Sequence, residues 1–512
     1  MIVDIPFTEL EKLLKAKASL ETIVSSLGMF GTPVETLDDN TIKLEVFPNR
    51  LDMLSTEGVA RSLDGFLGAR LGIPIWNIKP SKIEVNRKGK SSRPHIGFSA
   101  VRGAKLSADS LKGLMQMQEK IHTTIGRDRR KYSVGVYDLD KLKPPFTYEM
   151  LPLKEISFVP LDESSEMTGK EILESTEKGA KYAHLIKDGK APVLKDSLGN
   201  YLSMIPIINA DTCKVTQETT NFFIDSTGTA PGTEDIVALI AASLADRGGN
   251  IHVILPGPTF LPRRMKIDLS YINKITGLSL NKTEFGNLLN KMRLGYDGDV
   301  LIPPYRLDLF GPIDIAEEVA IAYGYDKFEG ELVPAEKPGE PLPIKFLENE
   351  VRKLMTGFGF LELKTFMLTS PELLKLSGDH KLEVNNPKSM NYSALRQSIL
   401  PLLFDVLSIN KDTEYPQRVF EVGTVFLPHE EPRISGLIAH SDASFAEVKG
   451  IVDGFLSAFG KTAAWKSGDH PFFMEGRTAV SDIGVYGEVS PEISEKLGMP
   501  LVGFEINLER IL

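Results

Sequence analysis

Apolar side chains recur along the chain at two spacings, and each spacing predicts a different element. Apolar residues three and four positions apart form one face of a helix, whereas short apolar runs rich in β-branched and aromatic residues are typical of buried strands. Helices are predicted at 20–27, 109–124, 234–245, 283–292 and 348–356. Strands are predicted at 96–101, 133–137, 222–225, 362–368, 419–426, 434–439, 479–488 and 501–506. This mixture, in a chain of 512 residues, predicts an α+β protein of several domains.

A short motif occurs twice in the same setting. Arg-Leu-Asp stands at 50–52 and at 306–308, and each copy is followed by two large apolar residues and a helix-like run. Upstream of each copy, a helix is predicted to start at 7–10 and at 269–272, where a hydroxyl residue can cap it. The ordered match predicts a small helical/β domain present in two copies. Chance similarity between short amphipathic helices is the alternative.

Composition shifts along the chain suggest where these domains end. The stretch between the two copies of the motif predicts a single α+β domain, and its basic opening segment at 86–93 is predicted to be a linker or loop. A segment rich in Pro, Gly and charge predicts a second linker at 336–346. The last segment, in which strands arrive mainly as neighbours, predicts an antiparallel sheet backed by helices. The predicted domains are 1–82, 83–260, 261–335 and 347–512.

Charge and cysteine content narrow the functional class. With 42% hydrophobic and 25% charged residues, the chain has the composition of a soluble globular protein. A net charge of −10 argues against a stand-alone nucleic-acid coat, so phosphate binding would need a local basic patch or a partner. The basic run at 127–131 could contact tRNA phosphates or could be an ordinary solvated loop. The single cysteine, Cys213, excludes an internal disulfide and a cysteine-based zinc cluster. No leader-like segment and no apolar run of about 18 residues is present, so we expect a cytoplasmic protein without membrane spans.

Four carboxylates lie close together after the second Arg-Leu-Asp motif. They are Asp308, Asp314, Glu317 and Glu318. One interpretation is a capping box, in which Asp314 caps a helix and Glu317 reaches back to the cap. Another is a site for a hard cation such as Mg²⁺, which prefers carboxylate oxygens. A third leaves Asp308 paired with Arg306.

Polar residues also follow the apolar strand at 222–225. Asp225, Thr227 and Thr229 lead into a glycine turn. Polar side chains at the end of a strand commonly line binding sites, but they are also common as turn formers. The sequence alone favours the turn.

In order along the chain, several segments resemble phenylalanyl-tRNA synthetase beta subunits of the short archaeal type. The matching segments are 45–52 (Glu-Val-Phe-Pro-Asn-Arg-Leu-Asp), 57–61, 206–209, 223–229, 306–326, 420–423 and 486–489. The resemblance implies a B1-like domain, a B3/B4-like editing domain, a B5-like domain and a non-catalytic class II synthetase-like module. It also implies an alpha2-beta2 heterotetramer that acts on tRNA(Phe), in which the alpha subunit uses ATP to activate phenylalanine, and a magnesium site at the four carboxylates that is shared with that subunit.

The resemblance further implies that the central domain hydrolyses tyrosine wrongly attached to tRNA(Phe). A hydrophobic pocket rejects one added hydroxyl by only about 100-fold, so a second, hydrolytic site is needed. The implied editing residues are Ser203, Asn209, Asp225 and Thr227. Because no Cys or Ser-His-Asp arrangement is visible, we expect a positioned water molecule as nucleophile. A scaffold subunit that binds tRNA without hydrolysis is the alternative.

The sequence departs from the family pattern at several positions. Tyr137 and Ile205 stand where the resemblance implies histidine and proline. Between Arg418 and Glu421 there is one residue too many for the Arg-x-Glu that grips ATP in class II enzymes, and strand alternation would turn these two side chains to opposite faces. The run before Arg477 lacks the glycines of the later ATP motif. We therefore expect the module at 347–512 to contact a catalytic alpha subunit and not to bind ATP; a self-sufficient ligase is the competing hypothesis.

Overall fold

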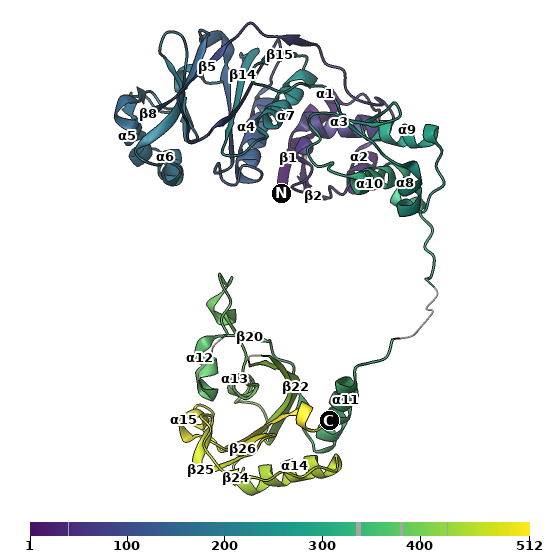
Figure 1. Cartoon of the computed structure of the whole chain (residues 1–512), viewed down its shortest axis with the longest axis vertical. Coiled ribbons are helices and arrows are strands. Elements are labelled where there is room, and N and C mark those ends of the chain that lie inside the picture. The colour runs from purple at the N-terminus through teal and green to yellow at the C-terminus, as the bar shows by residue number, and fades with distance from the viewer. Residues whose placement is uncertain (39, 334–338, 379–381, 428) are drawn as a thin grey trace. The chain divides into compact units, whose positions relative to one another are not determined.

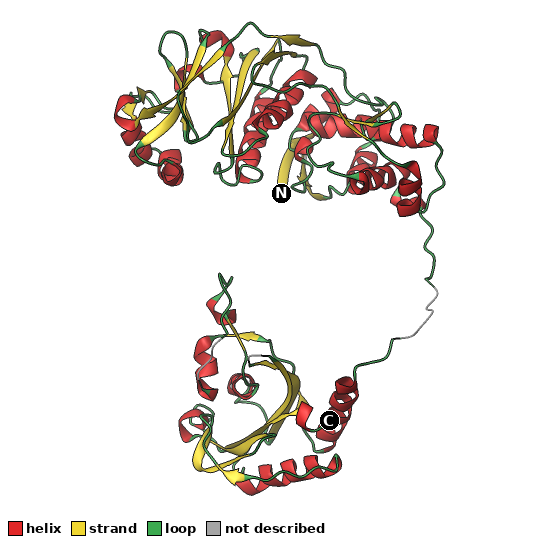
Figure 2. Cartoon of the chain, in the orientation of Figure 1, coloured by secondary structure: helices red, strands yellow, loops and turns green. Residues whose placement is uncertain are grey.

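The computed structural model describes residues 1–38, 40–333, 339–378, 382–427 and 429–512. The chain forms two compact units, Met1–Glu331 and Leu332–Leu512, each of which contains both helices and strands (Figure 1 and Figure 2). In the part of the chain so described, no helix is both long enough and apolar enough to span a membrane.

Two segments of the first unit have the same order of elements. The first consists of β1 (Ile2–Pro6), α1 (Phe7–Leu13), α2 (Leu20–Met29), β2 (Val34–Asp38), β3 (Thr41–Glu45) and α3 (Thr56–Phe66). The second consists of β16 (Arg263–Met265), α8 (Leu269–Thr276), α9 (Lys282–Lys291), β17 (Gly295–Tyr296), β18 (Val300–Ile302) and α10 (Pro312–Tyr323). Both sheets are antiparallel with the last strand in the middle, in the orders β1-β3-β2 and β16-β18-β17.

The Arg-Leu-Asp motif occupies the same place in both segments, between the last strand and the last helix. Arg50 donates from Nε and Nη2 to the two carboxylate oxygens of Asp52, both at 2.9 Å. Arg306 does the same to Asp308, at 2.9 and 2.8 Å. Burial alone would lower the pKa of Arg50, but the Asp52 carboxylate raises it above its ordinary value. The motif is therefore a buried two-pronged ion pair that fixes the turn before the helix.

The predicted helix starts are correct, but the expected hydroxyl caps are wrong. Thr8 lies inside α1, which follows Pro6 without a side-chain cap. Ser270 lies inside α8, whose cap is Asp268. The predicted helices at 20–27 and 283–292 are confirmed as α2 and α9.

The central segment is built on two five-stranded sheets. The first has the order β4-β15-β6-β14-β7 and consists of β4 (Ile78–Pro80), β15 (Asn250–Ile254), β6 (His95–Arg102), β14 (Asn221–Gly228) and β7 (Tyr132–Asp138). The second has the order β13-β12-β11-β8-β5 and consists of β13 (Ile208–Asn209), β12 (Tyr201–Met204), β11 (Lys190–Lys195), β8 (Phe146–Pro152) and β5 (Val85–Lys88). Shorter elements complete the segment: β9 (Ser157–Phe158), β10 (Met167–Thr168), α5 (Gly169–Ser175) and α6 (Glu177–Tyr182).

The first sheet is buried on both faces. Phe222 and Ile224 of β14 pack toward α4 (Ala108–Thr123) and α7 (Thr233–Asp246), whereas Phe223 between them packs toward the second sheet. Because successive side chains of a strand point to opposite faces, a strand covered on both sides is apolar at consecutive positions. This explains why 222–225, 96–101 and 133–137 are recognisable as strands in the sequence. The helices predicted at 109–124 and 234–245 are confirmed as α4 and α7.

Two predictions at the edge of this segment need correction. The linker or loop predicted at 86–93 is correct only in part: residues 89–93 are a loop, but 86–88 belong to β5, which pairs in parallel with β8, and Arg93 is buried. The predicted boundary at 82 falls after β4, which pairs in parallel with β15 of the central sheet. In both cases a short edge strand carries a polar sequence that does not distinguish it from a loop.

The second unit is an antiparallel sheet of seven strands with one parallel edge pair. Its order is β19-β22-β23-β27-β26-β25-β24, with β19 (Leu361–Glu362), β22 (Gln417–Phe426), β23 (Glu430–Ala439), β27 (Leu501–Asn507), β26 (Gly484–Val489), β25 (Phe473–Val480) and β24 (Lys466–Ser467). Helices α11 (Pro343–Gly357) and α14 (Phe445–Ala458) pack on one face, and α13 (Leu400–Ile409) packs on the other. Smaller elements are α12 (Pro371–Leu374), α15 (Pro491–Ser494), β20 (Leu368–Thr369) and β21 (Ala394–Leu395).

Three predicted ranges in this unit need correction. The predicted strand at 362–368 is a loop between β19 and β20, and the one at 479–488 is the hairpin of β25 and β26. Of the predicted linker 336–346, residues 336–338 lie outside the described residues and 343–346 belong to α11. The opposite orientation of Arg418 and Glu421 is confirmed: Arg418 pairs with Glu447 at 2.8 Å, whereas the fully buried Glu421 pairs with Arg396 at 2.7 Å.

Ion pairs at the end of α7 join the central segment to the N-terminal segment of the first unit. Arg247 donates to Glu9 of α1 at 2.9 Å and also to Glu57 of α3. The preceding residue, Asp246, accepts a hydrogen bond from Trp76 at 2.8 Å and lies 3.0 Å from Arg61 of α3. The helix of the central segment is thus tied to the N-terminal segment through charges that water barely reaches.

Replacing Arg247 should destabilise the first unit strongly. Arg247→Met leaves the buried carboxylate of Glu57 without its cation and leaves Glu9 with Lys12 alone. Loss of one member of a buried ion pair costs about 3–5 kcal/mol. We expect the free energy of unfolding, measured by urea titration, to fall by that order. Arg264→Met is the matched control, because its pairs with Asp297 and Asp299 are exposed and should contribute at most about 1 kcal/mol. Equal losses in the two variants would contradict the role given to Arg247.

Candidate functional site

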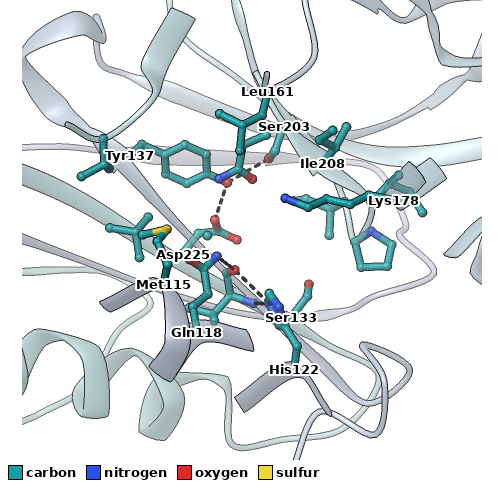
Figure 3. Close-up of a pocket in the computed structure, with 18 of the residues that line it drawn as sticks. Met115, Gln118, His122, Ser133, Tyr137, Leu161, Lys178, Ser203, Ile208 and Asp225 are labelled. Atoms are coloured by element: carbon teal, nitrogen blue, oxygen red, sulfur yellow. Dashed lines mark hydrogen bonds between the residues drawn. The ribbon is translucent and has the colours of Figure 1, made fainter. Parts of the chain in front are cut away.

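A cavity of about 460 Å³ lies in the central segment, where α4, β7 and β14 of the first sheet meet β12 and β13 of the second. Its wall includes Tyr137, Ser203 and Asp225 (Figure 3). Asn209 also lines it. Three of the four predicted editing residues therefore lie around one cavity, although they come from three different strands. The fourth, Thr227, is fully buried behind the wall.

The centre of this wall is a hydrogen bond between Tyr137 and Asp225. The Tyr137 hydroxyl donates to Asp225 Oδ1 at 2.6 Å. Strand register places Asp225 opposite Gly135, and a Cβ atom at position 135 would lie 2.3 Å from both Asp225 Oδ1 and the Tyr137 oxygen. Glycine at this position is therefore what allows the carboxylate and the phenol to approach each other.

Ser203 completes the cluster from the second sheet. Its Oγ lies 3.0 Å from the Tyr137 oxygen. A phenol has one proton, and the shorter distance assigns that proton to Asp225, so the Ser203 hydroxyl can donate to the phenol oxygen. Asn209 lies opposite Ser203 in the adjacent strand and also faces the cavity.

Burial changes the acidity of Asp225. Its removal from water raises its pKa to about 6, while the Tyr137 hydrogen bond and the charge of Arg93 act in the opposite direction. Tyr137 is likewise removed from water, which raises the pKa of its phenol well above 10. At neutral pH the cluster therefore holds an ionised carboxylate next to a neutral phenol.

Arg93 is the residue of this site that sequence reasoning missed. Its guanidinium donates to the side chain and the backbone oxygen of Thr227, at 3.1 and 2.9 Å, and to the backbone oxygen of Arg129 at 3.0 Å. Because no carboxylate contacts it directly within the described part of the chain, burial lowers the pKa of Arg93 to about 10. In the sequence it stands at the end of a basic run, and nothing distinguishes it there from its solvated neighbours.

The basic run at 127–131 has one buried member. Arg129 donates to the backbone oxygens of Pro206 and Ile207, at 3.1 and 2.8 Å, and its guanidinium lies 4.3 Å from the ring centre of Tyr182. It is therefore unavailable to a phosphate, whereas Arg127 and Arg130 are exposed. The interpretation as a tRNA contact is thus restricted to the exposed members of the run.

The opposite wall carries a buried histidine. His122 Nε2 accepts the backbone N–H of Val134 at 3.0 Å, and its Nδ1 lies 3.5 Å from Glu119. Burial lowers the pKa of His122, and the contact with His122, together with Arg129, lowers the pKa of Glu119 to about 2. The imidazole is therefore neutral and is held by the backbone of β7.

Cys213 also lines the cavity, but its chemistry is suppressed. Burial raises the pKa of its thiol to about 12. Since the thiolate is the nucleophilic form, covalent catalysis by this residue is excluded near neutral pH. The arrangement instead supports attack by a water molecule next to a carboxylate and a hydroxyl.

The four carboxylates after the second Arg-Leu-Asp motif do not converge on one point. Asp308 and Glu318 both accept from Arg306, at 2.8 and 2.6 Å. Asp314 lies inside α10 and accepts the backbone N–H groups of residues 310 and 311, so the predicted capping box with Asp314 as cap and Glu317 as its partner is wrong. Glu317 is exposed, and no group of three possible ligands is assembled among the described residues. These residues do not by themselves fit a magnesium ion.

Comparison with known proteins places the whole chain. Residues 332–508 match the phenylalanyl tRNA synthetase beta chain CLM domain, and residues 265–325 match the tRNA synthetase B5 domain. The phenylalanine–tRNA ligase beta subunit of Methanocaldococcus jannaschii is 38% identical, over 99% of this chain and 100% of that protein. The beta subunit of Archaeoglobus fulgidus is also 38% identical, over 99% of this chain and 98% of that protein.

A solved structure agrees with these matches. An N-terminal fragment of the phenylalanyl-tRNA synthetase beta subunit from Pyrococcus horikoshii superposes with a TM-score of 0.60 at 36% identity. It covers 63% of this chain and 99% of the fragment. The similarity to whole beta subunits extends over nearly every residue, and the chain belongs to the phenylalanine–tRNA ligase beta subunit family.

Proposed function

We propose that the chain is the non-catalytic beta subunit of an alpha2-beta2 phenylalanine–tRNA ligase in the cytoplasm. In this proposal the alpha subunit activates phenylalanine with ATP and Mg²⁺, and the central segment of this chain removes tyrosine from Tyr-tRNA(Phe). The observation that carries the editing step is the buried carboxylate of Asp225 on the wall of a cavity of about 460 Å³.

The cavity has the chemistry needed to read a phenol. An ionised carboxylate accepts the hydrogen bond of a hydroxyl but has nothing to accept from phenylalanine. A site built around such an acceptor discriminates far better than a purely apolar pocket. Ser203 and Asn209 lie on adjacent strands of the same wall and can orient the attacking water, while Thr227 supports the wall through Arg93.

The second unit is proposed to be a class II synthetase-like module that has lost ATP binding. Arg418 and Glu421 lie on opposite faces of β22, and the Glu421 carboxylate is fully engaged by Arg396 and Thr365. One nucleotide could therefore not be held by both groups, because Glu421 is buried and Arg418 lies on the other face. A magnesium ion near α10 would need donor oxygens from the alpha subunit, because Arg306 already occupies two of the four carboxylates.

A scaffold without hydrolysis is the second candidate. It is favoured by one observation: the Tyr137 hydroxyl already contacts both Asp225 and Ser203. If that contact closes the site to a substrate phenol, the central segment would bind tRNA without editing it.

The first prediction concerns assembly. The isolated chain should show no ATP–pyrophosphate exchange with phenylalanine, because the second unit lacks the Arg-x-Glu pair that binds ATP. Co-expressed with the alpha subunit from the same genome, it should co-purify as a heterotetramer that attaches phenylalanine to tRNA(Phe). Exchange activity in the isolated chain would instead establish a self-sufficient ligase.

The second prediction concerns editing by the assembled enzyme. Asp225→Ala should slow hydrolysis of Tyr-tRNA(Phe) by about 10- to 100-fold, the effect of losing one hydrogen bond to a charged group. Attachment of phenylalanine should be unchanged, which shows that the subunit is folded and assembled. The matched control is Asp162→Ala, an exposed carboxylate at the same cavity that pairs with Lys214. Wild-type enzyme that fails to hydrolyse Tyr-tRNA(Phe) would favour the scaffold.

A further inference from the structure

We infer that Tyr137 is a positioning residue of the editing site: its hydroxyl holds one oxygen of the Asp225 carboxylate, so that the other oxygen is presented to the hydroxyl of a tyrosyl group in the cavity. This inference rests on the proposed function. It assigns recognition of the substrate hydroxyl to one carboxylate oxygen of Asp225, and the orientation of that carboxylate to the hydroxyl of Tyr137.

The two oxygens of Asp225 have different surroundings. Oδ1 accepts the Tyr137 hydroxyl at 2.6 Å. Oδ2 accepts no hydrogen bond from any of the described residues, although Asp225 lines the cavity and the residue is almost fully buried. Oδ2 is also not one of the fully buried side-chain atoms that lack a partner, so it is open to the cavity. There a carboxylate oxygen takes its donor from water or from a ligand. Such an oxygen on a cavity wall is therefore suited to a ligand that brings a donor.

Tyr137 forms part of the wall and does not fill the cavity. Its side chain is fully buried, and its ring packs against Phe223 with 5.9 Å between ring centres. Ser203 holds the phenol oxygen from the second sheet at 3.0 Å (Figure 3). A volume of about 460 Å³ remains open with the ring in this place. The contacts on both sides of the phenol, together with the absence of a side chain at Gly135, make a fixed arrangement.

The Tyr137 hydroxyl also keeps the Asp225 carboxyl group ionised, the form that accepts hydrogen bonds at both oxygens. The other charged group that acts on Asp225 is the guanidinium of Arg93, which makes no hydrogen bond to it. The charge of Asp225 acts on the phenol of Tyr148 from β8, which is itself neutral because burial raises its pKa to about 12. A thiolate at Cys213 would raise the pKa of Tyr137, but burial keeps this thiol neutral near pH 7. The direct hydrogen bond from Tyr137 is thus the contact that lowers the pKa of Asp225 against the effect of burial, which leaves that pKa at about 6. Without it, the pKa would move toward neutrality and the carboxyl would be partly protonated at working pH.

Discrimination between the two amino acids follows from this arrangement. A tyrosyl group supplies the donor that Oδ2 lacks, whereas a phenylalanyl group would cover Oδ2 and leave it without any partner. Sites that offer a buried acceptor penalise the ligand that lacks the matching hydroxyl. Correctly charged Phe-tRNA(Phe) would therefore be spared without a steric barrier against it.

The test compares Tyr137→Phe with wild type in the assembled enzyme. The state of Asp225 is followed by infrared pH titration, with the protonated-carboxyl band assigned by its loss in Asp225→Asn. The midpoint should lie near 6 in wild type and rise by roughly one pH unit in Tyr137→Phe, the value of one hydrogen bond to a charged acceptor. Tyr148→Phe is the matched control, since its hydroxyl contacts the backbone oxygen of Arg93 and not Asp225. An unchanged midpoint in Tyr137→Phe overturns the inference.

Binding supplies the second readout. The probes are 3′-tyrosylamino-3′-deoxyadenosine and its phenylalanyl counterpart, which cannot be hydrolysed at the amide. By calorimetry, wild type should prefer the tyrosyl probe by about 10- to 100-fold, and Tyr137→Phe should lose most of this preference near neutral pH and regain part of it at higher pH. Equal binding of the two probes by wild type would show that Asp225 Oδ2 does not accept the tyrosyl hydroxyl, which overturns the inference.

Hydrolysis separates this inference from the proposed function. The rate of Tyr-tRNA(Phe) hydrolysis should fall at low pH, because Asp225 must be ionised to bind the tyrosyl hydroxyl. The pH at which the rate falls should be higher in Tyr137→Phe, because the pKa of Asp225 is higher there. Faster hydrolysis by Tyr137→Phe at every pH would show that the phenol blocks the site, which overturns the inference and leaves editing intact. Wild type that binds the tyrosyl probe selectively but does not hydrolyse Tyr-tRNA(Phe) would refute editing and leave the positioning role supported.

Discussion

A charge removed from water must be balanced inside the protein, and this constraint organises the first unit. Arg50, Arg61, Arg247 and Arg306 are all buried, and each faces at least one carboxylate. Two of these pairs fix the turns before the last helices of the two similar segments, and the others connect α7 of the central segment to α1 and α3. Removing one partner from such a pair costs more than the pair itself contributes, so these contacts specify which segments meet.

The cavity is where the same constraint is only partly met. Arg93 and Asp225 are both buried and influence each other, yet no ion pair joins them, and their pKa values move to about 10 and about 6. Perturbed acidity beside a cavity is typical of functional sites. By contrast, Glu421 and Arg396 in the second unit are equally buried but pair directly at 2.7 Å, as expected of a structural contact.

The sequence predicted what depends on periodicity and composition. Strands β6, β7 and β14 are apolar on both faces, and α7 is apolar nearly throughout, so their patterns were clear. The edge strands β4 and β5 are short and polar, so the predicted boundary at 82 separates β4 from its sheet, and β5 falls in a segment predicted to be a linker or loop. Asp225, Ser203 and Asn209 were named from a family resemblance. The role of Gly135 depends on strand register, and that of Arg93 on contacts between distant segments, neither of which local sequence reveals.

The apolar core around α4 and α7 is continuous with that of the two similar segments, from Val3 to Ala322. The central segment cannot therefore be excised at the ends of its own sheets without exposing both helices to water, together with the charges of Asp246 and Arg247. The compact unit that carries the cavity is therefore the whole of Met1–Glu331 and not the central segment by itself. A truncated form of this subunit that is meant to keep the cavity must therefore retain both of the similar segments as well as the central one.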